Sequence, residues 1–255
     1  MYLIDTHSHL YTSDFNNDIN DVLVRAVENG VQKILLPAID AETHEQMLAL
    51  ESRYPAVCRA MMGLHPCSVK DNWKEELVIV EKYLQQRKFI AIGEIGLDFY
   101  WDTAFSVQQY EAFNIQMQWA MERKLPIVVH TRNAMQETIE AVQPFARKGL
   151  RGIFHCFGDD VETAHKIIDM GFLLGIGGVL TYKKSGLAET LKHIDLKHLV
   201  LETDAPYLTP VPYRGKRNES VYLKIIAEQL ASVKNISIEE VQKGTTSNAE
   251  KLFGC

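Results

Sequence analysis

Short apolar runs alternate with longer amphipathic segments along the whole chain, and this alternation limits the fold more than any other feature. The apolar runs are nearly continuous in Val, Ile, Leu, Met and Phe, which is typical of strands covered on both faces in a parallel sheet. They lie at Tyr2–Asp5, Lys33–Ala38, Cys58–Gly63, Phe89–Ile92, Pro126–His130, Gly152–Phe154, Phe172–Ile176 and His198–Leu201. The amphipathic segments predict helices at Asp18–Asn29, Ala41–Arg53, Lys74–Arg87, Phe105–Arg123, Met135–Arg147, Val161–Met170, Gly186–His193, Glu219–Val233 and Ile238–Leu252.

Eight strands alternating with helices in 255 residues predict an α/β protein of the (β/α)8 TIM-barrel type. No Pro/Gly/Ser-rich linker or charge block interrupts the chain, so we expect a single domain over residues 1–255. An open doubly wound sheet is the alternative. The absence of a Gly-x-Gly-x-x-Gly motif after the first strand counts against it. Ser237 and Glu240 have the spacing of a capping box before the last helix.

The charge balance excludes one class of nucleic-acid protein. The chain has 27 basic and 33 acidic residues and a net charge of −6, which does not fit the broad basic surface of a non-catalytic nucleic-acid binder. A nucleic-acid enzyme stays open, because bound divalent ions would supply positive charge locally.

The same sequence gives no sign of export or membrane insertion. No apolar run approaches the ~20 residues of a membrane span, and the first residues lack the basic and apolar regions of a signal peptide. The four cysteines are scattered, without CxxC spacing. We therefore expect a cytoplasmic protein without disulfides, without membrane association and without an obligate protein partner.

Histidines and acids gather where the predicted strands end, which is the catalytic end of a barrel. His7 and His9 follow the first strand two residues apart, so both rings face the same side of an extended chain. His65 follows the third strand. The remaining members end strands four, five, six and eight, and they are Glu94, His130, His155 and Asp204.

Imidazole and carboxylate together suit Zn²⁺, Mn²⁺ or similar ions. Six such ligands are more than one tetrahedral ion needs, and they are His7, His9, Glu94, His130, His155 and Asp204. A carboxylate can bridge two ions, and Glu94 lies near the middle of the set. We therefore expect two divalent ions, Zn²⁺, Mg²⁺ or Mn²⁺, which would activate a hydroxide and polarise a phosphoryl or carbonyl oxygen. Asp204 can accept a proton while holding a metal.

A single histidine at a strand end is more often structural than functional, but six ligand-type side chains at one end of a barrel are difficult to explain in that way. The role of His65 stays open between contact with the substrate, support of a ligand and a structural role. Glu202 is expected to be a buried partner rather than a catalyst.

These strand-end motifs together resemble the TatD family of metal-dependent deoxyribonucleases, within the amidohydrolase-like barrels. The matching segments extend from end to end of the chain and are Asp5–Leu10, Gly63–Pro66, Ile92–Trp101, His130–Arg132, His155–Phe157, Leu201–Leu208 and Arg214–Glu219. The resemblance implies hydrolysis of DNA phosphodiesters. It also implies that His7, His9, Glu94 and Asp204 surround one ion and that Glu94, His130 and His155 surround the other.

With this family as a guide we assign Asp204, Glu94 and His65 as catalytic and expect a 3'–5' exonuclease, with abasic-site endonuclease activity as the open variant. Two segments are candidates for DNA binding. A basic loop before the predicted helix at Glu219 would bind phosphate at that helix N-terminus through Arg214, Lys216, Arg217 and Asn218. Tyr100 and Trp101 follow strand four and would stack on bases.

Two other functions remain as alternatives. The first is an amidohydrolase or esterase acting on a small C–N or C–O bond. Many such barrels bridge their metals with a carbamylated lysine, whereas strand four here supplies Glu94 and strand five has no lysine in place. The second is a non-catalytic binding module, which the presence of all six ligand-type side chains opposes.

Overall fold

The computed structural model describes residues 2–254. Its strands are short and lie close to the predicted runs. They are β1 (Leu3–Asp5), β2 (Val31–Leu36), β3 (Cys58–Ala60), β4 (Ile92–Asp98), β5 (Ile127–Arg132), β6 (Gly152–Phe154), β7 (Leu173–Ile176) and β8 (Leu199–Leu201). The helices are α1 (Ile19–Glu28), α2 (Ala41–Arg53), α3 (Trp73–Gln86), α4 (Ser106–Arg123), α5 (Met135–Ala146), α6 (Val161–Asp169), α7 (Leu187–Lys192), α8 (Leu223–Lys234) and α9 (Ile238–Phe253).

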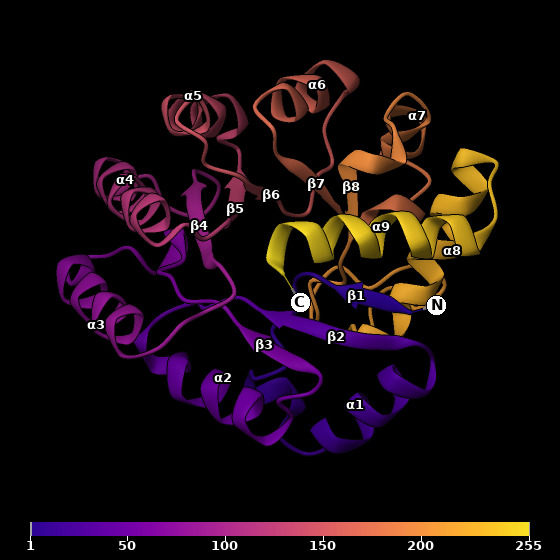
Figure 1. The fold of residues 1–255 in the computed structure, drawn as a ribbon, viewed down its shortest axis with the longest axis horizontal. Helices are drawn as coiled ribbons and strands as arrows, with labels where there is room; N and C mark the ends of the chain where they lie inside the picture. Colours follow the sequence, from indigo (N-terminus) through magenta and orange to yellow (C-terminus); the bar gives the residue numbers. More distant parts are fainter. Residues whose placement is uncertain (1, 255) are drawn as a thin grey trace.

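The strands form a ring of parallel neighbours. Strands β1 to β3 make one sheet and β4 to β8 make a second, each in sequence order. Isolated parallel bridges join the two sheets at both seams, between Met62 and Ile92 and between Ser8 and Ala205. The helices α1 to α8 surround this ring on the outside (Figure 1). The barrel prediction is confirmed, and the open doubly wound sheet is wrong.

Strand β4 differs from its predicted bounds. We expected a strand over Phe89–Ile92, whereas β4 runs over Ile92–Asp98 and is buried along its whole length. Its glycines resemble turn residues in the sequence, but Gly96 has a packing role. It has φ +152°, and a Cβ there would lie 1.9 Å from the carbonyl oxygen of His130. Glycine at this position therefore lets β4 approach β5 closely.

Helix α9 closes the amino-terminal end of the barrel. In Figure 1 it lies across the strands instead of outside them. Its Ala249 and Phe253 share one apolar cluster with Ile4 of β1, Val128 of β5 and Val200 of β8. The helix begins with the predicted capping box, in which Ser237 and Glu240 each accept from the other's main-chain N–H. One end of the barrel is thus sealed by an apolar layer, which leaves the carboxyl ends of the strands for a site.

The helix predicted at Glu219 begins later than expected. Residues Ser220–Tyr222 form a single 3-10 turn, and α8 starts at Leu223. Glu219 directly precedes that turn, and its carboxylate pairs with Arg25 and Arg217. A negative charge therefore lies beside the helix end at which we expected an anion to bind. Within residues 2–254, no helix is both long enough and apolar enough to cross a membrane.

Candidate metal centre

Glu94 lies at the centre of the carboxyl-terminal end of the barrel, in β4, and is 2% exposed. Its two carboxylate oxygens face different histidines. Oε2 lies 3.0 Å from Nε2 of His7 and 3.5 Å from Nε2 of His9. Oε1 lies 2.8 Å from Nδ1 of His130 and 2.8 Å from Nε2 of His155. A single buried carboxylate therefore divides the four imidazoles into two pairs.

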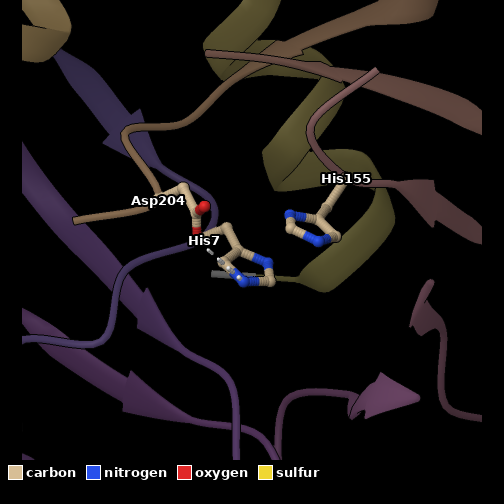
Figure 2. Close-up of side chains that lie close together, drawn as sticks. All are labelled: His7, His155 and Asp204. Carbon is tan, nitrogen blue, oxygen red and sulfur yellow. Dashed lines mark ion pairs between the residues drawn. The ribbon is translucent and has the colours of Figure 1, made fainter. Parts of the chain in front are cut away.

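Asp204 joins the His7 and His9 side of the cluster. It follows β8 with φ +57°, and its main-chain N–H donates to the carbonyl of His7 at 2.9 Å. This geometry brings Oδ1 within 3.7 Å of Nε2 of both His7 and His9. Figure 2 shows Asp204, His7 and His155 facing one space, with the His7 and His155 rings stacked 3.9 Å apart.

In His9 and His130, one ring nitrogen is hydrogen-bonded to a residue outside the cluster, and this contact determines which tautomer faces the cluster. Tyr11 donates its hydroxyl hydrogen to the carbonyl of Pro37, so it accepts from Nδ1 of His9, 3.0 Å away. Asp98 accepts from Nε2 of His130 at 2.9 Å. In the neutral rings, Nε2 of His9 and Nδ1 of His130 are therefore left without hydrogen and face the centre.

His65 has the opposite arrangement. Its Nδ1 accepts from the main-chain N–H of Cys67 at 3.0 Å, which leaves the ring hydrogen on Nε2. That Nε2 lies 3.3 Å from Oε1 of Glu94. His65 therefore presents a hydrogen-bond donor to the cluster, whereas a metal ligand needs a lone pair. The assignment of His65 as a catalytic residue outside the ligand set stays a prediction.

The electrostatics also favour a cation between these groups. Burial raises the pKa of Glu94, but the charges of His155 and His7 outweigh it and hold that pKa well below its usual value. Burial raises the pKa of Asp204 to about 6. Nitrogen lone pairs and carboxylate oxygens 2.8–3.0 Å apart repel one another unless a proton or a metal ion lies between them.

Within the described residues, three overlapping groups have ligand atoms close enough together to hold a metal ion, and Glu94 belongs to two of them. They consist of His7, His155 and Asp204, of His7, His9 and Glu94, and of His65, Glu94 and His130. In the group that contains His65, the hydrogen on Nε2 of that ring makes it a donor and not a ligand. The donor set is imidazole and carboxylate, without thiolate, so the residues present fit a catalytic zinc-like or manganese-like ion better than a structural zinc.

The predicted aromatic residues lie at the rim of the same end. The side chains of Tyr100 and Trp101 are 50% and 70% exposed. The guanidinium of Arg132 lies 3.7 Å from the ring centre of Tyr100 and 5.2 Å from that of Trp101. Sequence reasoning gave Arg132 no role of its own, although it is the last residue of β5, two residues after His130.

The basic loop is not uniform. Arg217 forms a bidentate ion pair with Asp18 and a second ion pair with Glu219. Asn218 is fully buried and donates to the main-chain carbonyls of Thr203 and Tyr207 at 2.7 and 2.6 Å. These contacts give both side chains structural partners, and they do not favour the phosphate-binding role that the sequence suggested.

The other two members of the loop remain accessible. Arg214 and Lys216 are exposed, and their cationic groups lie 4.2 Å from the ring centre of Tyr182 and 5.7 Å from that of Tyr213, respectively. They can still meet an anion that approaches the rim.

Two buried acidic residues, Glu202 and Asp98, contact the ring nitrogens of His155 and His130 that face away from Glu94. Glu202 is fully buried, as expected for a structural partner, and accepts from the main-chain N–H of Cys156. Its Oε1 lies 3.6 Å from Nδ1 of His155. Sequence reasoning gave no role to Asp98, the partner of His130. The signal was present, because Glu94 and Asp98 are four residues apart and share one face of an extended strand.

The parallel barrel and the imidazole–carboxylate cluster at its carboxyl end define a class, the metal-dependent hydrolases built on a (β/α)8 barrel. Residues 4–254 match the model of the family described as TatD related DNase. The chain belongs to this family.

Relatives and solved structures agree with this assignment. The chain is 36% identical over 252 residues to the uncharacterized metal-dependent hydrolase YabD of Bacillus subtilis, with 98% of each chain covered. It is 32% identical over 259 residues to the 3'-5' ssDNA/RNA exonuclease TatD of Pantoea ananatis, with 99% of each covered. The crystal structure of YJJV, a TatD homologue from Escherichia coli, superposes with a TM-score of 0.93 at 28% identity, covering 99% of this chain and 98% of that one.

Proposed function

We propose that this protein is a 3'–5' exonuclease that hydrolyses DNA phosphodiester bonds with two divalent metal ions. The observation that carries the proposal is the placement of Glu94, whose Oε2 faces His7 and His9 and whose Oε1 faces His130 and His155. A carboxylate placed in this way would help to hold two closely spaced ions. The name of the Pantoea ananatis relative supports the choice of substrate and polarity.

The ligands divide between the two proposed ions according to the oxygen of Glu94 that they face. His7, His9 and Asp204 would hold the ion on the Oε2 side, and His130 and His155 would hold the ion on the Oε1 side. Zn²⁺, Mn²⁺ or Mg²⁺ could occupy these positions. When bound, the ions would neutralise charge on the phosphoryl oxygens and lower the pKa of a water molecule.

The protein's own residues position the reactants and move the proton. Asp204 would accept the proton of the attacking water, because burial raises its pKa to about 6 and keeps proton transfer near neutral pH favourable. His65 would donate from Nε2 to an oxygen of the scissile phosphate, since its Nδ1 is held by the N–H of Cys67. Glu94 remains ionised throughout, because the neighbouring imidazoles lower its pKa.

DNA would approach across the rim. Tyr100 and Trp101 offer exposed rings on which bases can stack, and each stacked base contributes about 1–3 kcal/mol. Arg214 and Lys216 would attract the phosphates. We assign no phosphate contact to Arg217 or Asn218, because their donors are engaged inside the protein. We also propose that the enzyme acts in the reducing cytoplasm, which fits the free thiols of Cys58, Cys67 and Cys156.

The test is a metal-supplemented assay on oligonucleotides labelled at the 5' or the 3' end. A 5'-labelled single strand should give a ladder that shortens with time, while a 3' label should appear at once as mononucleotide. A duplex with one abasic site would give a single cut if the endonuclease variant applies. Glu94→Gln is the matched inactive control. Cleavage of cyclic amides or esters without cleavage of any oligonucleotide would overturn the proposal.

A further inference from the structure

Asp98 uses its two carboxylate oxygens for two different tasks. Oδ2 accepts from Nε2 of His130 at 2.9 Å. Oδ1 accepts from the main-chain N–H groups of Tyr100 at 2.9 Å and of Trp101 at 3.3 Å. The side chain is 2% exposed. One buried carboxylate therefore contacts both a candidate metal ligand and the loop that carries the exposed aromatic rings.

The main chain that carries this carboxylate is held in place independently of the loop. The main chain of Asp98 is clamped on both sides by the buried amide of Gln109 in α4. Oε1 of Gln109 accepts from the N–H of Asp98 at 2.9 Å, and its Nε2 donates to the carbonyl of Asp98 at 3.1 Å. The carboxylate of Asp98 therefore extends from a main chain that Gln109 of helix α4 holds without any contact from the loop.

The two rings of the loop that Asp98 holds and the guanidinium of Arg132, at the end of β5, form a compact cationic–aromatic platform, which we define as Tyr100, Trp101 and Arg132. The rings of Tyr100 and Trp101 meet edge to face with centres 4.8 Å apart, and the guanidinium of Arg132 lies over Tyr100. Residues Asp98 and Arg132 are also paired across β4 and β5. Exposed rings backed by a guanidinium are suited to stack on an unpaired base.

We propose that Asp98 is a positioning residue that couples this platform to His130. It holds the hydrogen of His130 on Nε2, which keeps Nδ1 free as a ligand atom, and it holds the amides of the platform at a set distance from that atom. The base under the platform and the phosphate at the metal centre would then keep a fixed separation. This inference rests on the proposed nuclease function for the identity of the platform's ligand, but not for the two contacts of Asp98.

Two substitutions separate the tasks. In Asp98→Asn, the amide oxygen can still accept from the two loop N–H groups, while the NH₂ group faces Nε2 of His130. An amide donates where the carboxylate accepted, so it moves the ring hydrogen to Nδ1, which faces Glu94. Asp98→Ala removes both contacts. Asp102→Asn is the matched control, because it removes one carboxylate from the exposed part of the same loop, where Asp102 pairs with Lys70.

The first measurement is calorimetric titration of the metal-free protein with Zn²⁺. Asp98→Asn and Asp98→Ala should each weaken one binding event about 10- to 100-fold and leave the other unchanged, since that is the usual effect of removing a carboxylate behind a ligand histidine. Asp102→Asn should bind as the parent does. Unchanged Zn²⁺ affinities in Asp98→Asn would overturn the proposal.

The second measurement is hydrogen–deuterium exchange of the peptide that contains residues 100 and 101. Asp98→Ala should lose protection of these amides, whereas Asp98→Asn should retain it. Equal protection in Asp98→Ala and the parent would overturn the loop half of the proposal. Neither measurement needs a substrate, so both give an answer even if the proposed nuclease function fails.

The third measurement is steady-state cleavage of a short single strand at saturating metal. Asp98→Asn should lower kcat and leave KM near that of the parent. Asp98→Ala should lower kcat and also raise KM, roughly as far as Trp101→Ala does, which we expect to be five- to hundredfold. A purely structural role for Asp98 would change the melting temperature without this split between kcat and KM, and that result would contradict the proposal.

Discussion

Replacing Arg217 by alanine should lower the stability of the protein and leave its affinity for DNA unchanged. The guanidinium donates to both oxygens of Asp18 at 2.8 and 2.7 Å, to Glu219 at 2.8 Å and to the main-chain carbonyl of Asp14 at 2.7 Å. A single exposed ion pair contributes at most about 1 kcal/mol. Because this one is bidentate and joined to a second carboxylate, we expect a loss of about 2 kcal/mol.

For a chain of this size, such a loss lowers the melting temperature by roughly 4–8 °C. Differential scanning calorimetry at pH 7 measures it, with Arg214→Ala as an exposed control that should shift the transition by no more than about 1 °C. The reasoning would be refuted if Arg217→Ala had the same melting temperature as the parent and a higher KM for DNA. The guanidinium would then bind phosphate and would not stabilise the fold.

The pH dependence gives the same prediction a second check. The hydrogen bond from Arg217 holds the pKa of Asp18 below its usual value. A carboxyl whose pKa is lowered by folding stabilises the protein above its unfolded pKa of about 3.9, and that contribution is lost as the pH falls through the folded value. The difference in melting temperature between the parent and Arg217→Ala should therefore be full at pH 6 and shrink below about pH 4.

Three further outcomes follow from the site and the loop that supports it. Glu94→Gln should abolish hydrolysis and lower the metal content measured by elemental analysis, because an amide offers only one good ligand atom. Unchanged metal content and activity would contradict the bridging role of Glu94. A chelator should abolish hydrolysis and lower the melting temperature, and added Zn²⁺ or Mn²⁺ should restore both. Asn218→Ala should destabilise the protein by about 2–4 kcal/mol in a denaturant titration, because it strips buried hydrogen bonds from two main-chain carbonyls, and an unchanged midpoint would count against that role.

The sequence was enough to predict the barrel because each strand carries its own signal. A run such as Ile127–Val129 is apolar on both faces, and only a covered parallel strand needs that pattern. The cluster of histidines and carboxylates was predictable for a related reason. Its residues lie within the strands or soon after them, so the direction of the strand sets where each side chain goes. Glu94 and Asp204 meet because both strands end on the same side of the ring.

The parts that sequence reasoning missed depend on contacts between distant segments. Nothing near Arg217 in the chain marks Asp18 as its partner, so the sequence could not predict this ion pair. The phosphate-binding role of the loop stays a prediction. The bounds of β4 were misread because Gly96 is required by the approach of β5 and not by a turn. The contact of Asp98 with His130 could not be predicted from the sequence, because it forms only when β5 lies beside β4.

Helix α9 has a consequence for the order in which the molecule can be assembled during synthesis. Its Ala249 and Phe253 complete an apolar layer that begins with Ile4, so the first and last segments of the chain depend on the same cluster. During synthesis, that layer therefore stays open to water until helix α9 has emerged from the ribosome. We expect that a truncated chain without α9 retains every candidate metal ligand and yet aggregates.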